Sequence, residues 1–168
     1  MNKEYCDYCV DVETAKKQEV EFMKKYGYYI HLVPDVAPMD IHTHGLMKSF
    51  KLFELDFKIY LSPKNALFIV NTIAQDYIKN GLFYGTRIIC LPELNNQNVA
   101  MKYTSHDNNI VIRCILVDKN GKFPWDEGCD PLFKVQWNEQ NEKDYKTITE
   151  TMEGLPLEYI QQTIAERC

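Results

Sequence analysis

The chain has 168 residues, the length of one ordinary domain, and 45% of them are apolar and 26% charged, which is typical of a globular protein. Its formal net charge of −5 argues against a nucleic-acid-binding protein, which needs a basic surface to displace counterions. No apolar run approaches the roughly 18 residues that a membrane helix requires, so we expect no membrane partner.

The N-terminal segment is polar, and no apolar stretch follows it, which predicts a chain without a secretory signal and a cytoplasmic location. In that reducing compartment, the six cysteines are expected to be thiols or metal ligands rather than a disulfide framework. Cys6 and Cys9 form a single Cys-x2-Cys pair. Because no apolar strand precedes the pair, it does not fit a thioredoxin-like redox motif.

Residues 11–26 have the period of an amphipathic helix. The apolar face combines Val12, Ala15, Phe22, Met23 and Tyr26. Gly27 is a natural stop for this helix. Residues 28–33 have the composition of a strand, which Pro34 ends, and residues 34–40 are predicted to be a loop.

Two of the four histidines lie in the stretch Asp-Ile-His-Thr-His-Gly-Leu, residues 40–46. On an extended backbone, His42 and His44 point to the same side, because the side chains of a strand alternate between its faces. Two imidazoles so placed can ligate one metal ion, or one can orient a substrate while the other transfers protons. The alternative is that both rings hydrogen-bond to backbone in a turn, with Gly45 supplying a special dihedral angle.

A metal-dependent enzyme built on this pair needs a third ligand and an open coordination position. The candidates for the third ligand are His31, His106, Asp40 or a cysteine. A structural zinc site is a second reading, in which Cys6 and Cys9 join His42 and His44 as a two-Cys, two-His set. Asp-x-His-x-His also begins amidohydrolase-type barrels, but a barrel needs about 250 residues, so we reject that fold.

Residues 52–61 alternate as a strand does, with Phe53, Leu55, Phe57, Ile59 and Leu61 on one side. The polar side presents Glu54, Asp56, Lys58 and Tyr60. Ser62 and Pro63 follow as an N-cap and a first-turn proline, and they open a helix that runs to about Asn80, before Gly81. Its apolar face is expected to pack on the sheet.

Further strands are predicted at residues 87–91, which read as a short buried strand, at 99–104 and at 110–117. Residues 105–109 form a polar turn between the last two, and Asn120-Gly121 is a turn signal. An irregular segment, 123–131, leads to a predicted strand at 132–137. Residues 138–153 are charged, which fits either a solvated helix or a mobile connection, and residues 156–167 close the chain as a short helix.

Strands outnumber helices in this series, and hairpins link several of them. The sequence therefore predicts a single α+β domain with a mainly antiparallel sheet and two or three helices packed on it. Its core is expected at about residues 10–137, with the charged segment and short helix at 138–168.

The acidic segment around Cys129 offers oxygen ligands for a hard cation in Asp126, Glu127 and Asp130. The spacing is not that of a calcium loop, so a solvated turn is the preferred interpretation. Asp40, Trp125 and Asp126 remain candidate binding residues.

Several features in chain order resemble an uncharacterised bacterial family known as domain of unknown function DUF4262. They are the Lys-Lys-Tyr-Gly-Tyr end of the first helix, His-Thr-His-Gly-Leu at residues 42–46, the strand near 53–60, the Pro63 helix closing on Lys-Asn-Gly, and residues 118–126 with their Gly-x-Phe-Pro-Trp turn. The resemblance covers about residues 10–137. That family has no settled activity, so the resemblance implies a shared fold unit and a bacterial origin.

Three functions remain open at this point. The leading expectation is a non-catalytic factor that binds a protein partner, as accessory and immunity proteins do, because the chain is acidic, rich in aromatic residues and without a complete catalytic set. The alternatives are a metal-dependent hydrolase using His42 and His44, and the structural zinc site. An unpaired strand edge would also suffice for a homodimer.

Overall fold

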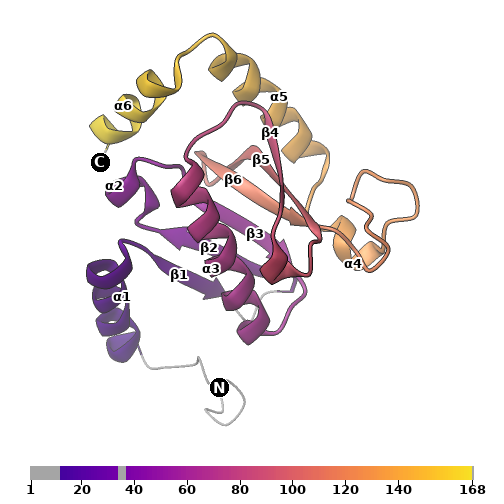
Figure 1. Ribbon diagram of the computed structural model, residues 1–168, viewed down its shortest axis with the longest axis horizontal. Helices are drawn as coiled ribbons and strands as arrows, with labels where there is room; N and C mark the ends of the chain where they lie inside the picture. The colour runs from indigo at the N-terminus through magenta and orange to yellow at the C-terminus, as the bar shows by residue number, and fades with distance from the viewer. Residues whose placement is uncertain (1–11, 34–36, 168) are drawn as a thin grey trace.

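A six-stranded sheet in the order β1-β2-β3-β6-β5-β4 lies at the centre of the protein (Figure 1). The computed structural model describes residues 12–33 and 37–167. All neighbouring strands are antiparallel except β3 and β6, which pair in parallel. The strands are β1 (Tyr29–Val33), β2 (Met39–His44), β3 (Leu55–Ile59), β4 (Thr86–Cys90), β5 (Asn98–His106) and β6 (Asn109–Leu116).

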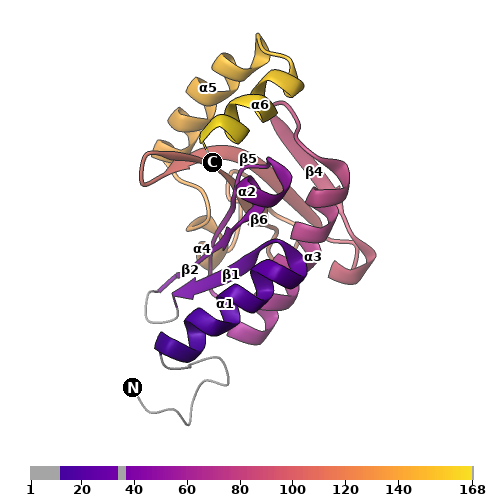
Figure 2. The same ribbon diagram turned by 90° about the vertical axis from the view of Figure 1, so that its left-hand side faces the viewer.

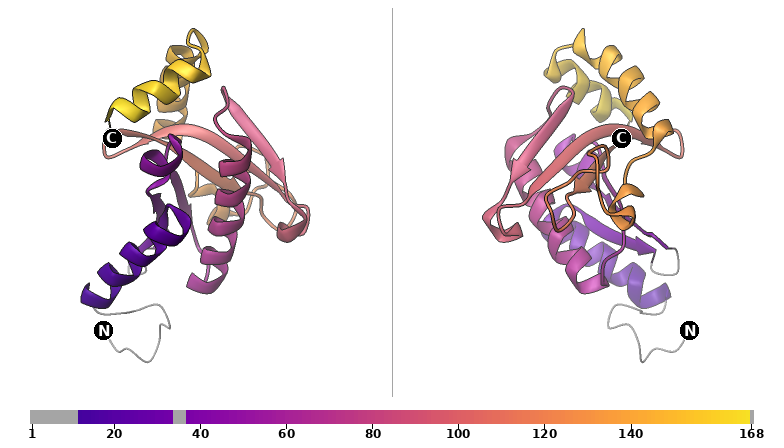
Figure 3. Two further views of the ribbon diagram at one scale, coloured as in Figure 1. Left: turned by 60° about the vertical axis from the view of Figure 1, so that its left-hand side comes forward. Right: turned by 90° about the vertical axis from the view of Figure 1, so that its right-hand side faces the viewer.

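Helices surround this sheet on several sides. In Figure 1, α3 crosses in front of the strands and α1 lies beside β1, and Figures 2 and 3 show α5 and α6 together at the end of the molecule away from α1. The helical segments are α1 (Val12–Tyr26), α2 (Leu46–Phe50), α3 (Pro63–Asn80), the 3-10 turn η2 (Pro92–Leu94), α4 (Pro131–Lys134), α5 (Glu139–Glu153) and α6 (Leu157–Arg167). No helix among the described residues is both long and apolar enough to cross a lipid bilayer.

The face of the sheet under α3 forms the main hydrophobic core. Every side chain of α3 that is buried belongs to this core, and the side chains facing it from the strands include Ile41, Phe57, Ile112 and Tyr103. Ser62 caps the helix, accepting a hydrogen bond from the backbone N–H of Asn65 at 3.3 Å. The core also takes Met152, Ile160 and Ile164 from the two C-terminal helices.

The opposite face of the sheet carries a polar row. Cross-strand pairing joins its members in sequence: His31 to His42, His42 to Asp56, Asp56 to Arg113, and Arg113 to Lys102. Residues directly opposite each other on neighbouring strands project to the same face. This face is therefore polar from β1 to β5.

Only part of the polar face is covered by a second, smaller core. Ala100 and Ile115 pack there against Trp137, with Phe123 and Tyr145 alongside. These residues come from β5, β6, α5 and the connection that leads to it, on the side seen at the right of Figure 3. At the other end of the row, His31 on β1 is exposed.

The predicted α+β class is confirmed, and most predicted elements form close to their predicted bounds. The helices at 12–26, 63–80, 139–153 and 157–167 are present, as are the strands near 29–33, 55–59, 98–106 and 109–116. Of the two readings for residues 138–153, the helix is correct.

Two sequence predictions are wrong. Residues 132–137 do not form a strand: Asp130 accepts a hydrogen bond from the backbone N–H of Leu132 at 2.9 Å, and Pro131 starts the short helix α4. The strand at 86–90 is an edge strand with an exposed pattern, not a buried one. On the apolar face predicted for α1, which lies beside β1, Phe22 and Tyr26 are 44% and 46% exposed.

Candidate metal centre

The two histidines of the 40–46 stretch lie on one side of strand β2. His42 and His44 both belong to the extended segment Met39–His44, and their ring centroids are 4.7 Å apart. The third member comes from the neighbouring strand, because His31 on β1 is paired directly with His42. The ring of His31 lies 4.9 Å from that of His42 and 5.8 Å from that of His44.

These three residues, which we call the histidine triad, have the arrangement of a metal site. One ring nitrogen from each lies within 4.8 Å of the others. Nitrogens that share a tetrahedral zinc ion are roughly 3.4 Å apart, given Zn–N bonds of 2.0–2.1 Å. Small rotations of the side chains would therefore bring the triad to bonding distance.

Two members of the triad, His42 and His44, are held in a state that favours metal binding. Burial lowers the pKa of His42 first, and the neighbouring His31 and His106 lower it further. The pKa of His44 is also lowered, by burial and then by His42 and His31. Lowered pKa values keep these imidazoles neutral near pH 7, and a neutral imidazole is the form that ligates metals.

A polar atom without a partner marks the triad most directly. The Nδ1 of His42 is buried and makes no hydrogen bond to any protein atom of the described chain. Such atoms are uncommon, because an unpaired buried polar group costs about 1–3 kcal/mol. The backbone-bonded alternative for His42 therefore lacks the hydrogen bond it requires at this nitrogen.

Local structure on both sides of the pair fixes its position. The ring of Tyr29 stacks on that of His44 with centroids 5.1 Å apart. Gly45 follows at φ 103°, and a Cβ there would stand 2.5 Å from the Sδ of Met23 and 2.7 Å from the carbonyl oxygen of Gly27. Glycine is thus needed for the chain to turn from β2 into α2.

A second group of potential ligands adjoins the triad. It consists of Asp40, Asp56 and His106, with one ligand atom from each within 4.8 Å of the others. Asp40 precedes His42 by two positions on β2, and Asp56 is paired directly with His42 from β3. The ring of His106 lies 6.0 Å from that of His42.

His106 reaches this place because of the tight turn between β5 and β6. His106 pairs with Asn109, so Asp107 and Asn108 alone form the loop, with φ values of 49° and 64°. Two residues with positive φ are the mark of a type I′ turn, which suits Asp and Asn. The sequence predicted a longer turn, and the shorter one places His106 at the tip of the hairpin.

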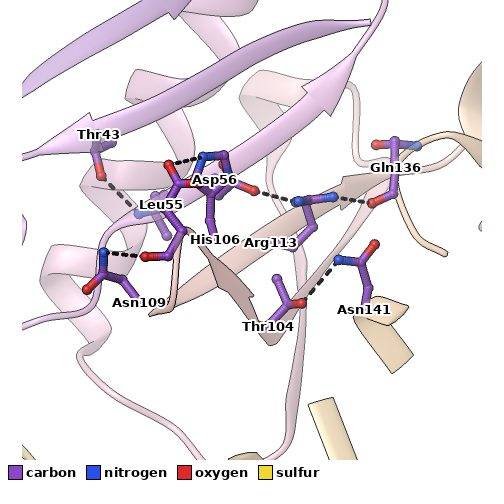
Figure 4. Close-up of polar contacts among 10 residues, drawn as sticks. Thr43, Leu55, Asp56, Thr104, His106, Asn109, Arg113, Gln136 and Asn141 are labelled. Carbon is purple, nitrogen blue, oxygen red and sulfur yellow. Dashed lines mark hydrogen bonds and ion pairs between the residues drawn. The ribbon is translucent and has the colours of Figure 1, made fainter. Parts of the chain in front are cut away.

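Asp56 is the most buried member of the second group, at 1% exposed. Its Oδ2 accepts a hydrogen bond from the Nε of Arg113 at 2.6 Å, and the Nη1 of Arg113 donates to the carbonyl oxygen of Gln136 at 2.7 Å. Figure 4 shows Arg113 and His106 on either side of the carboxylate. Burial raises the pKa of Asp56 even though Arg113 opposes this.

The other predicted site residues lie apart from these groups or outside the described chain. Cys6 and Cys9 fall among the residues that are not described. The ring of Trp125 stacks on that of Phe123 at 4.8 Å, and Asp126 accepts a hydrogen bond from the backbone N–H of Phe123 at 2.8 Å, so both shape the 118–130 turn.

A surface hollow among the described residues lies away from the triad. It measures about 210 Å³ and lies between α3, η2 and the ends of β5 and β6, and its lining includes none of the four histidines. A metal ion needs no more room than its own coordination sphere, so the ligand atoms of the triad mark the candidate site without a large hollow.

Asp56 is the residue that sequence reasoning missed. The alternating pattern placed it on the polar side of the strand. Its role follows from its position opposite His42 on the paired strand, which only the strand register shows. His31, His106 and Asp40 were named only as candidate third ligands, because strand register decides which of them meets the pair.

No family model, curated protein or solved structure matches this chain. The resemblance to DUF4262 therefore stays an expectation, and the function is argued from the site alone.

Proposed function

We propose that the protein is a metal-dependent hydrolase that holds a zinc-like divalent ion through His31, His42 and His44. The observation that carries this proposal is the convergence of three ring nitrogens within 4.8 Å, one from each histidine of the triad. One of these residues, His42, also has a buried ring nitrogen without a hydrogen-bond partner. Three protein ligands and a water molecule are the usual set of a catalytic zinc site.

The placement of the triad suits catalysis better than structural support. His31 is exposed while His42 and His44 are half-buried, so an ion held by the triad would be reachable by water and substrate from the side of His31. When bound there, zinc lowers the pKa of its water to about 7 and so supplies a nucleophile at neutral pH. The protein's part is to hold three imidazoles in place, with Tyr29 fixing the ring of His44.

The test is zinc-dependent hydrolysis of an activated ester, 4-nitrophenyl acetate, by protein stripped with a chelator and reloaded with one equivalent of zinc. We expect activity in the reloaded wild type and a loss of more than about 100-fold in His44→Ala, because loss of even a supporting partner costs 10–100-fold. Gln162→Ala, an exposed change on α6, should leave the rate unchanged. Equal rates with and without zinc would refute the proposal.

A protein partner stays a prediction. The large apolar side chains that are exposed are spread over several elements, with Phe22 and Tyr26 on α1, Phe68 on α3, Ile88 on β4 and Tyr159 on α6. The unpaired edges of β1 and β4 in the described sheet keep the homodimer prediction open in the same way. Neither feature points to a partner as directly as the triad points to a metal.

A further inference from the structure

Three buried polar atoms of the described chain that lack a hydrogen-bond partner gather at one place. They are the Nδ1 of His42, the Oδ1 of Asp40 and the Oδ1 of Asp56. The first of them belongs to a residue that would ligate the proposed zinc ion. The two carboxylate oxygens belong to the second ligand group and are left without an explanation.

The orientation of Asp56 distinguishes the second ligand group from an ordinary cluster of acidic side chains. Its Oδ2 is occupied by Arg113, which fixes the carboxylate and leaves Oδ1 directed towards His106. The Nδ1 of His106 stands 3.6 Å from Oδ1, which is beyond hydrogen-bond length. A side chain that is 1% exposed thus keeps one oxygen without a hydrogen bond, facing His106 at the distance of a charge contact.

Charge gives a second reason to expect a cation. Arg113 neutralises one of the two carboxylates, that of Asp56, and its Nη1 donates to the carbonyl oxygen of Gln136. No ion pair is formed by Asp40 among the described residues. A buried carboxylate oxygen without hydrogen bonds or counter-charge is costly, and a bound cation would remove that cost.

We propose that Asp40, Asp56 and His106 form a second site, for a hard divalent cation such as Mn²⁺ or Mg²⁺, next to the histidine triad. Two carboxylates and one imidazole form an oxygen-rich set, which suits these ions better than the three nitrogens of the triad do. His42 lies between the two sites, since its ring is 4.7 Å from that of His44 and 6.0 Å from that of His106.

The second site indicates which class of substrate the proposed hydrolase would accept. This consequence rests on the proposed function. Two adjacent cations stabilise both the attacking and the leaving oxygen of an in-line displacement at phosphorus. The substrate class is then a phosphate diester. Hydroxide forms a new O–P bond, the P–O bond to the alcohol breaks, and the departing alkoxide takes a proton from water.

The test uses full-length protein loaded with one equivalent of zinc and titrated with Mn²⁺, whose six-line electron paramagnetic resonance signal reports the free ion. We expect wild type to bind one equivalent of Mn²⁺. Asp40→Asn and His106→Gln should each weaken this binding at least about tenfold, the scale on which ligand-supporting groups act. Asp144→Asn, the same change on α5 and away from the site, should bind Mn²⁺ as wild type does.

The outcomes separate this inference from the proposed function. Two results would overturn the second site and leave the triad standing. In the first, the protein retains zinc but binds no Mn²⁺; in the second, Asp40→Asn binds Mn²⁺ as well as wild type does. If the protein binds no zinc but still binds Mn²⁺ in a way that depends on Asp40, the triad would be overturned and the second site would stand. For the substrate, bis(4-nitrophenyl) phosphate should be hydrolysed only by the doubly loaded protein, and an equal rate with zinc alone would overturn the diester assignment.

Discussion

Single side chains at the candidate site serve both the fold and the chemistry, and Asp56 is the clearest case. One oxygen of its carboxylate pairs with Arg113 at 2.6 Å while the other faces the proposed second cation. The side chain of Arg113 is itself only 4% exposed. This ion pair is therefore buried on both sides, in the middle of the polar row.

Arg113→Met should lower the free energy of unfolding by roughly 3–5 kcal/mol, because it leaves a buried carboxylate without its partner. Breaking the exposed pair of Lys17 and Glu13 by Lys17→Met should cost less than about 1 kcal/mol. Urea denaturation of both variants measures these costs. The double variant Arg113→Met, Asp56→Leu should recover part of the lost stability, because it removes the buried carboxylate as well. If the double variant is as unstable as Arg113→Met alone, the uncompensated charge of Asp56 is not the cause of the loss.

Among the elements, the junction of β2 and α2 positions the histidine pair. The carboxylate of Glu54 accepts the hydroxyl of Thr43 at 2.7 Å and the backbone N–H groups of Gly45 at 3.0 Å and Met47 at 3.1 Å. It thereby replaces an N-cap side chain for α2, which Gly45 cannot provide. Burial nevertheless raises the pKa of Glu54.

Glu54→Gln should destabilise the protein by about 1–3 kcal/mol, because an amide offers one acceptor in place of two and turns N–H groups towards buried donors. Since Glu54 lies next to the strand that carries the pair, zinc binding should weaken as well. Thermal unfolding and zinc titration measure the two effects. Glu150→Gln, an exposed change on α5, is the control, and equal stability of the two variants would contradict this role.

The 118–130 turn depends on Asp118, whose carboxylate accepts the backbone N–H groups of Asn120, Lys122 and Asp130, each at 2.9 Å. These bonds lower its pKa, with Asp130 the largest cause. A pKa lower in the folded state stabilises the fold above the unfolded value of about 3.9 and ceases to do so as pH falls through the folded value.

The stability lost in Asp118→Asn should therefore be constant between about pH 5 and 7 and shrink below about pH 4. Urea denaturation across this range, with Glu127→Gln in the same turn as control, measures the difference from wild type. A difference that stays the same down to about pH 3 would show that the charge on Asp118 is not what stabilises the turn.

Sequence patterns predicted elements with strong local signals and failed where distant contacts decide. Residues 63–80 carry a cap, a proline and a helical period, and the helix has those bounds. The 132–137 strand was wrong because the local Asp130-Pro131 start of α4 was not recognised. At the site, the spacing of His42 and His44 was readable, whereas Asp56 required the register of three strands, including a parallel pair formed over more than 50 residues.

At the scale of the whole molecule, the two faces of the sheet have different roles. The face under α3 buries the large apolar side chains, while the polar row across the other face gathers His31, His42, Asp56 and Arg113 from four strands. The triad joins β1 to β2, and the second ligand group joins β2 to β3 and β5, so bound ions would link neighbouring strands of the sheet. Metal binding and folding should then be coupled.

Zinc at 100 times its dissociation constant should add about 2.7 kcal/mol to the free energy of unfolding, which corresponds to a rise in Tm of about 5–10 °C for a chain of this size. Differential scanning calorimetry with and without zinc measures the shift. His31→Ala should abolish most of it, since only two imidazoles of the triad remain. A shift that survives in His31→Ala would mean that zinc binds elsewhere.

The central claim is that three imidazoles, and no cysteine, hold the metal ion. X-ray absorption spectroscopy at the zinc edge, on full-length protein with one equivalent of zinc, counts those ligands. The account predicts a first shell of nitrogen and oxygen alone at about 2.0–2.1 Å, with the outer scattering of three imidazole rings. Sulfur at about 2.3 Å would instead assign the ion to Cys6 and Cys9, and a protein that retains no zinc at one equivalent would contradict the metal site altogether.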